Sequence, residues 1–242
     1  MAKLNTNEYV SLEVIDKICE ALNCQPGELL EYIGEEQKSK KDIFAANAPA
    51  LYIGGIRIFY KGVNREMEEN SLWYPIGQFV PRAVSSEEER KSYTKEIADI
   101  VPSLRKIVKD FNHDQFQTPY RSGGWTVQQV VHHMADNDIN ASLRLKRALT
   151  EEEPMASSYH PNLWAELTDY KDTPIEISLM LLEALHYRLI HVIHGLKPTD
   201  FDRRFNTEVL GWITVDVAIQ RFIWHNRHHT SHIQSLAQRM NW

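Results

Sequence analysis

The chain has 242 residues, 43% of them hydrophobic, so it can bury the core of one domain or slightly more. Its formal net charge of −6 excludes a basic field over the whole surface that would attract nucleic acid or anionic lipid. The only cysteines, Cys19 and Cys24, exclude a disulfide framework and a thiolate metal cage. No apolar run reaches the ~20 residues that span a bilayer, and the first residues lack the apolar core of a signal peptide. We therefore expect a cytoplasmic protein without membrane contact.

The first 70 residues predict a short, partly helical extension. Apolar spacing indicates two short helices, at residues 11–23 and 26–33. The run ALYIGGIRIFY (residues 50–60) is typical of a hairpin around Gly54-Gly55. Two short helices cannot bury a core of their own, so this part must dock on the rest, pair with another chain or stay mobile.

The run NEYVSLEVIDKICEALNCQPGELLEYI (residues 7–33) resembles the C-terminal half of a Cro-type (XRE) helix-turn-helix domain. The first helices and most of the recognition helix, which enters the major groove, would lie before Met1. Residues 1–35 carry two basic side chains and seven acidic ones, the wrong sign for contact with phosphate. We therefore expect a truncated helix-turn-helix-like segment over residues 1–35, and we do not expect nucleic acid as a partner.

Residues 36–66, with much of the charged run EEQKSKKD, are predicted to be a linker. Our hypothesis is that the linker is translated intergenic sequence between two adjacent genes. Met67 opens a segment suited to be a natural start, and Lys61-Gly62-Val63 can be encoded by AAAGGAGTN, which resembles a ribosome-binding site. Codons without a GGAG core would contradict the hypothesis.

From Ser86 onward, apolar residues recur at helical spacing. Ser86 followed by three glutamates predicts a first helix to about Phe111, which Pro102 interrupts. Thr126 and Gln129 form a capping box for a second helix that ends near residue 149. A third helix is predicted to begin at a Thr173 cap with Pro174 in its first turn, and a fourth to run from Thr214 to about Met240. The apolar stripe predicted for the third helix consists of Ile177, Leu181, Leu185, Leu189, Val192 and Leu196. Four such helices favour an all-α fold, an antiparallel four-helix bundle over residues 67–242.

Two histidines one helical turn apart, His225 and His229, lie in the run WHNRHHTSHI. On a helical wheel of about 100° per residue, both fall within or beside the apolar face, whereas His228 and His232 turn toward solvent. In the run VVHHMADNDIN, His133 borders the apolar face of the second helix and His132 points almost the opposite way. Three neutral imidazoles can fill three positions around a catalytic divalent metal ion and leave a fourth open. His133, His225 and His229 are therefore the predicted metal ligands.

Other residues of these helices have weaker predicted roles. Asn137 and Asn140 share the face of His133 and could orient a bound water or a ligand imidazole. No residue stands out as a general base, with Asp136 and Asp138 as weak candidates. The remaining histidines are expected to be surface or structural residues: His113, His160, His186, His191 and His194. An isolated HxxxH pattern is more often a polar helix face than a metal site, and Asn226 stands where a zincin has its catalytic glutamate.

Three motifs in the second part of the chain resemble those of one known family. These are YPIGQFVPR (residues 74–82), TPYRSGGWTVQQVVHHMAD (118–136) and WHNRHHTSHI (224–233), and with them residues 71–242 resemble the YfiT group of the DinB-like superfamily. The resemblance implies a four-helix bundle that holds one nickel or zinc ion through His133, His225 and His229. It also implies a metal-dependent hydrolase, with a metal-dependent thiol S-transferase that uses bacillithiol as the alternative.

Both activities rest on the same property of the metal ion: with three neutral ligands it keeps its full charge and acidifies a bound water or thiol. The expected partners are a small-molecule substrate, for the transferase a low-molecular-weight thiol, and a second copy of the chain in a homodimer. An alternative from another class is a transcriptional regulator of the XRE type that senses metal or thiol through the bundle. A bundle that binds metal without turnover is a third.

Overall fold

The computed structural model describes residues 51–53, 56–58 and 71–242, within two units that comprise residues 1–71 and 72–242. In the first unit, β1 (Leu51–Ile53) pairs antiparallel with β2 (Ile56–Ile58), Leu51 opposite Ile58, which confirms the predicted pairing of the hairpin strands. The two short helices, the helix-turn-helix-like segment and the linker predicted before residue 71 lie outside the described residues.

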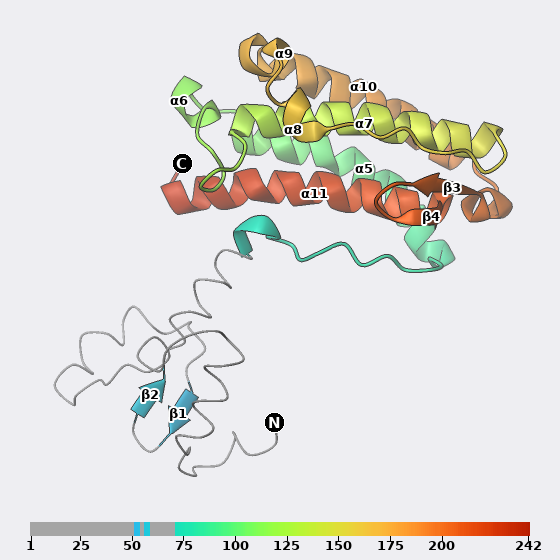
Figure 1. Cartoon of the computed structure of the whole chain (residues 1–242), viewed down its shortest axis with the longest axis horizontal. Coiled ribbons are helices and arrows are strands. Elements are labelled where there is room, and N and C mark those ends of the chain that lie inside the picture. The colour runs from blue at the N-terminus through green and yellow to red at the C-terminus, as the bar shows by residue number, and fades with distance from the viewer. Residues whose placement is uncertain (1–50, 54–55, 59–70) are drawn as a thin grey trace. The chain divides into compact units, whose positions relative to one another are not determined.

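The second unit is built on four long helices (Figure 1). They are α5 (Glu87–Val108), α7 (Val127–Thr150), α10 (Ile175–His194) and α11 (Val215–Met240). Shorter elements connect them: α6 (His113–Phe116), α8 (Pro161–Trp164), α9 (Thr168–Asp172), the 3-10 helix η2 (Pro198–Asp202), β3 (Arg204–Thr207) and β4 (Gly211–Thr214). The predicted all-α four-helix bundle is confirmed. The added feature is the antiparallel β3–β4 hairpin, in which Phe205 lies opposite Ile213.

Capping residues set where three of the long helices begin. Ser86 and Thr126 each accept a hydrogen bond from the backbone N–H three residues on, in complete capping boxes, and Thr214 caps α11 in the same way without a box. The prediction for the third helix was wrong at its start: Pro174, not Thr173, is the N-cap of α10, and no side chain caps it. The predicted interruption at Pro102 was also wrong, because α5 continues through that residue.

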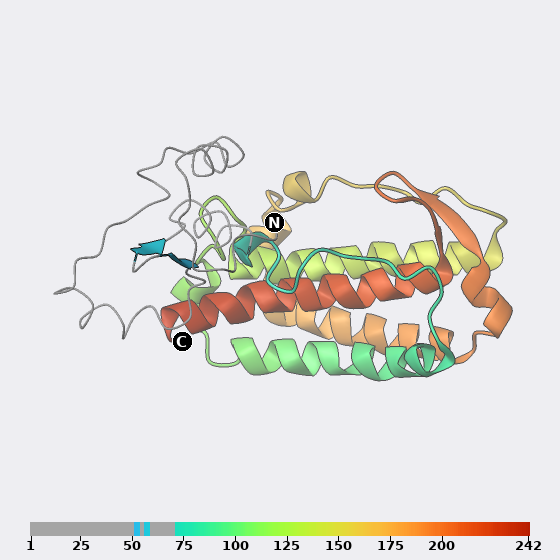
Figure 2. The ribbon, with the colours of Figure 1, turned by 90° about the horizontal axis from the view of Figure 1, so that it is seen from below.

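The direction of the helices differs from the predicted antiparallel order. Figures 1 and 2 show that α7 and α10 run the same way and that α5 and α11 run the opposite way. The connection of residues 151–174 makes this possible by returning along the bundle. It begins beside the hairpin, where the Ala156 N–H donates to the Asn206 carbonyl, and it ends near the start of α7, where the Gln128 amide donates to the Tyr170 carbonyl. A helix cannot follow its predecessor in parallel without such a crossover.

The buried face of α10 is not the predicted stripe. Ile177 and Leu181 are exposed, and only Leu189 of that stripe is fully buried. The core-facing residues are Ser178, Leu179, Leu182, His186, Leu189 and Ile193. Because α10 carries apolar side chains on two faces, periodicity alone cannot decide which face turns inward.

A strap, defined as residues 72–86, runs along α11 before α5 begins (Figures 1 and 2). Asp216, in the first turn of α11 and almost fully buried, holds the end of the strap. Its carboxylate accepts hydrogen bonds from the Ser85 N–H at 2.8 Å and the Tyr93 hydroxyl at 3.0 Å, and Arg90 lies 3.4 Å away. One buried carboxylate therefore joins the strap, α5 and α11.

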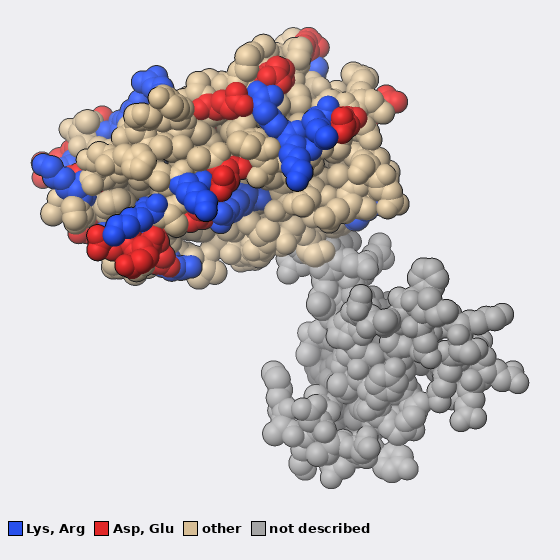
Figure 3. Space-filling model, turned by 180° about the vertical axis from the view of Figure 1, so that it is seen from behind, with Lys and Arg blue, Asp and Glu red and all other residues tan. Residues whose placement is uncertain are grey.

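Surface charges pair between helices and do not gather by sign. Arg105 on α5 donates to Glu176 at 2.8 Å and to Glu183 at 2.6 Å on α10. On the face turned away in Figure 1, Figure 3 shows basic and acidic side chains interspersed among wide uncharged areas. Of the helices that the structure describes, none combines the length and apolarity needed to cross a membrane.

We predict that Asp216→Ala lowers the free energy of unfolding by about 3 kcal/mol, because three donors lose a buried acceptor. Urea unfolding followed by circular dichroism measures the change. Asp202→Ala, at an exposed position, is the control and should stay within about 0.5 kcal/mol of the wild type. Equal effects of the two substitutions would contradict this role of Asp216.

Candidate functional site

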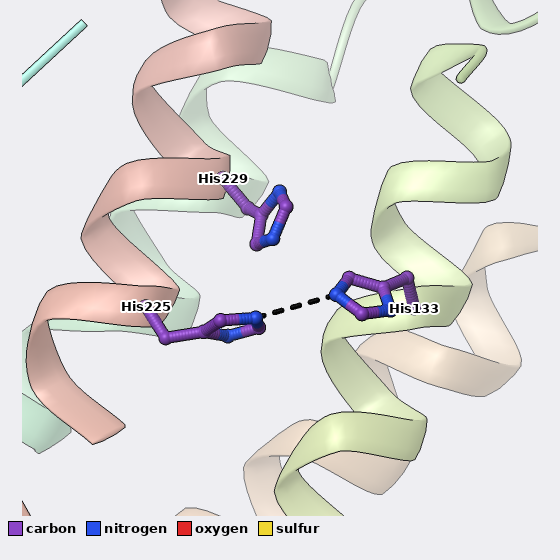
Figure 4. A group of neighbouring side chains, drawn as sticks. All are labelled: His133, His225 and His229. Atoms are coloured by element: carbon purple, nitrogen blue, oxygen red, sulfur yellow. Dashed lines mark hydrogen bonds between the residues drawn. The ribbon is translucent and has the colours of Figure 1, made fainter. Parts of the chain in front are cut away.

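The predicted ligands come together between α7 and α11. The Thr126 cap places His133 in the second turn of α7, and the Thr214 cap places His225 and His229 in the third and fourth turns of α11. His133 and His229 are 5% and 8% exposed, so the rings lie within the packed interior. Figure 4 shows all three rings pointing into the space between the two helices.

The nitrogens of the three rings are close enough to share one ion. Nε2 of His133 and Nε2 of His225 lie 3.3 Å apart, and one nitrogen from each of the three residues falls within 4.8 Å of the others. Two nitrogens bound at the usual zinc distance to one tetrahedral ion would lie about 3.3 Å apart. The spacing of these rings therefore fits a divalent metal ion with imidazole ligands.

Burial keeps the three imidazoles neutral. It lowers the pKa of His133 to about 4, and it lowers the pKa values of His225 and His229 well below the usual 6.5, with neighbouring imidazoles adding to the effect. A neutral imidazole has a free lone pair, which is the form that binds metal. The buried Nδ1 atoms of His133 and His229 have no hydrogen-bond partner within the described residues.

Two neighbours orient these rings. The indole of Trp125 packs against His133, with ring centroids 4.5 Å apart. The amide nitrogen of Asn137 lies 3.1 Å from Nδ1 of His225, in the orienting position predicted for it. Asn140, predicted for the same role, instead donates to the Asp136 carbonyl.

The prediction for His228 and His232 was wrong, because both are buried, at 8% and 3% exposure. The strap covers them: Nε2 of His232 donates to the Trp73 carbonyl at 3.1 Å, and the Tyr74 ring lies beside His228. A helical wheel treats the side facing the strap as solvent. Together with His229, these residues form a second group of three whose nitrogens lie within 4.8 Å of one another.

Two observations favour the first group as a metal site. His232 of the second group already bonds the strap through Nε2 and stacks on Tyr120, with ring centroids 4.1 Å apart. The first group reaches a cavity, because His225 is one of the lining residues of that cavity. The two groups share His229, so the same nitrogen cannot serve both.

Two further buried histidines have structural partners. Nδ1 of His132, which was predicted to point away from the core, lies 2.7 Å from the Ser178 hydroxyl on α10. His186 lies 2.7 Å from Asp138, as expected of a structural residue. Asp138 also accepts hydrogen bonds from Asn226 at 2.9 Å and from Asn137 at 3.4 Å, so it connects to His225 through Asn137.

Neither aspartate considered as a general base faces the cavity. Burial raises the pKa of Asp138, whose oxygens are occupied by His186 and Asn226. Burial also raises the pKa of Asp136, which accepts a hydrogen bond from the Tyr170 hydroxyl at 2.7 Å. These carboxylates therefore position other groups and do not contact a ligand in the cavity.

The cavity has a volume of about 100 Å³, and His225 and Asn137 are among its lining residues. Its walls come from α7, α10, α11, the β3–β4 hairpin and residues 156–158. Sequence reasoning missed its charged lining residues, Arg144, Arg221 and Glu208. Spacing could have indicated the arginines, because Arg221 precedes His225 by one turn and Arg144 follows His133 by three turns.

Comparison with known proteins matches both parts of the chain. The model of the DinB superfamily matches residues 102–233, and that of the Cro/C1-type HTH DNA-binding domain matches residues 1–35. Proteins of Bacillus cereus and Bacillus anthracis, named "Putative metal-dependent hydrolase", are 44% identical over 173 residues, which is 72% of this chain and 99% of each relative. YfiT from Bacillus subtilis, described as "a probable metal-dependent hydrolase with an unusual four-helix bundle topology", superposes with a TM-score of 0.70. It is 38% identical and covers 71% of this chain and 99% of its own.

We predict that Asp138 and His186 act as one unit. Asp138→Ala should lower the free energy of unfolding by about 3 kcal/mol or more, because His186 and Asn226 lose their buried partner. In a double-mutant cycle with His186→Ala, the combined loss should fall short of the sum by about 1 kcal/mol or more. Urea unfolding of the four proteins measures this, and strictly additive losses would contradict the pairing.

Proposed function

The chain belongs to the DinB superfamily, and on this premise we propose that it is a metal-dependent hydrolase in which His133, His225 and His229 hold one divalent ion, zinc or nickel. The observation that carries the proposal is the 3.3 Å separation of Nε2 in His133 and His225, with a nitrogen of His229 within 4.8 Å of both. Of the three residues, His225 lines a cavity. When bound, such an ion polarises a substrate carbonyl and lowers the pKa of a coordinated water.

The surrounding residues prepare this site. Asn137 fixes the orientation of the His225 ring, and Trp125 packs against His133 and excludes water from that side. The cavity leaves an approach to His225 open, as a catalytic site requires. A small cavity of this kind fits a small-molecule substrate.

A thiol S-transferase is the alternative for the same site, because the charge that acidifies water also converts a thiol into a thiolate. A regulator of transcription is the alternative from another class, and the helix-turn-helix match over residues 1–35 favours it. The acidic balance of those residues, seven acidic side chains and two basic, opposes DNA binding. The near absence of cysteine supports a cytoplasmic location.

Metal content tests the ligand set. Protein purified without a nickel column should carry close to one zinc or nickel per chain by elemental analysis, and His225→Ala should lose it. His232→Ala is the matched control from the second histidine group and should keep it. Loss of the metal in His232→Ala but not in His225→Ala would assign it to His228, His229 and His232. Absence of metal from all three proteins would overturn the proposal.

The same preparations distinguish the two activities. Hydrolysis of ester and amide panels that disappears in His225→Ala supports the hydrolase. Metal-dependent transfer of bacillithiol or cysteine to a chloronitrobenzene acceptor, without hydrolysis, would make the protein an S-transferase. Metal without either activity would leave a bundle that binds metal without turnover.

We also propose that the chain is a homodimer. Four large apolar side chains on the outer side of α10 are exposed to between 38% and 67%: Ile177, Met180, Leu181 and Tyr187. They recur at helical spacing, and such a stripe on one helix can pack against its own copy around a twofold axis.

Light scattering after size exclusion should give twice the chain mass of 28.2 kDa for the wild type. Met180→Glu places a charge in the proposed interface and should shift the protein to the monomer mass. Leu143→Glu, at an exposed position on α7, serves as the control and should remain a dimer. A monomeric wild type, or a dimer unaffected by Met180→Glu, would exclude this interface.

A further inference from the structure

Two arginines line the cavity beside the histidine cluster. Arg144 extends from α7 and Arg221 from α11, and Arg221 precedes His225 by one helical turn, about 6 Å along the axis. Both side chains are partly buried. Two positive charges therefore lie on the cavity wall, and that of Arg221 is one helical turn from the proposed ligand His225.

Neither guanidinium has a carboxylate partner among the described residues. Arg144 donates twice to the Ser157 carbonyl, through Nε at 3.1 Å and Nη2 at 2.6 Å. The Arg221 guanidinium lies over the Phe79 ring, whose centroid is 5.9 Å from Cζ of the arginine. By contrast, Arg90 and Arg105 pair with acidic side chains of neighbouring helices.

Electrostatics indicates that these charges are only partly compensated. Burial has the largest effect and lowers the pKa values of both arginines, and the charge of Arg144 lowers that of Arg221 further. Tyr159 and Glu208 act in the opposite direction on Arg144 alone, without forming an ion pair with it. The acidic residue at the cavity wall is Glu208, which is exposed on the turn of the hairpin and forms no ion pair with either arginine. The cavity thus carries two cations and one exposed anion.

The other walls are largely apolar. They include Leu145, Leu189, Phe205, Ile213 and Phe222. A cavity with largely apolar walls, two guanidinium groups and His225 in its lining favours a ligand with a short carbon skeleton and an anionic group.

We propose that this cavity binds an anionic small molecule whose carboxylate or phosphate group is held by Arg144 and Arg221, with its reacting group next to His225. Guanidinium matches both anions because it donates two parallel N–H groups. The part that concerns the reacting group rests on the proposed function, whereas the anion site depends only on the arginines.

Isothermal titration of the full chain with glutarate tests the anion site. Glutaramide, which has the same skeleton without charge, is the ligand control, and inorganic phosphate distinguishes the two kinds of anion. Each titration is carried out as purified and after removal of metal with a chelator, so that a carboxylate–metal bond cannot imitate the site. Elemental analysis of the same samples tests the metal proposal separately.

Arg221→Gln and Arg144→Gln should each weaken binding of the preferred anion by about tenfold or more, with or without metal. Arg221 donates no hydrogen bond to another residue that the structure describes, so its replacement should leave the fold intact. Arg188→Gln, at an exposed position on α10, removes the same charge and should leave binding unchanged. Circular dichroism confirms the fold of each variant.

Tighter binding of glutarate or phosphate than of glutaramide, lost in the cavity variants alone, establishes the anion site even if the samples contain no metal. Three outcomes overturn it: no binding of either anion to the wild type, equal binding of glutarate and glutaramide, or equal affinities in all variants. If metal is bound through the histidines and one of these three outcomes is found, the proposed function stands and only the anion site is excluded.

Discussion

The burial of imidazoles between helices is the constraint on which the rest of this structure depends. His132, His133, His186, His228, His229 and His232 are all less than 9% exposed in a bundle whose core is mainly apolar. A buried polar group without a partner costs free energy, so each ring needs a hydrogen bond, a stacking partner or a ligand. His132 and His186 have polar partners from α10 and α7, and His228 and His232 pack under the strap. His133, His225 and His229 face one another, and for them the compensation that we propose is a bound ion.

The parallel course of α7 and α10 determines where a ligand can reach this cluster. It requires the crossover of residues 151–174, which lies along the bundle beside the β3–β4 hairpin. The hairpin and the start of the crossover enclose a cavity over α7 and α11 that has His225 in its lining. The strap closes the other side of α11. The topology therefore leaves one approach to the histidines open and covers another.

Two buried carboxylates, those of Asp216 and Asp138, have structural roles, and neither faces the cavity. Asp216 joins the strap to α5, and Asp138 joins α7 to α10 and α11 through His186 and Asn226. The arginines follow a different pattern, since those between helices are paired whereas the two in the cavity are not. A charge without an ion-pair partner in a partly buried position is costly for stability alone, and it is therefore a reason to look for a ligand.

Local chemistry in the sequence was enough to predict the starts of α5, α7 and α11, because a cap is an interaction over three residues. The apolar periodicity also indicated that His133, His225 and His229 face inward, since the inward face of an amphipathic helix follows from its apolar residues. In the structure their ring nitrogens lie within 4.8 Å of one another. The periodicity failed for α10, which has two apolar faces, and for His228 and His232, which only the strap makes interior. The parallel helix order and the cavity were likewise decided by tertiary structure alone. They depend on contacts between segments far apart in the chain, and the periodicity of a single helix contains no information about what packs against it.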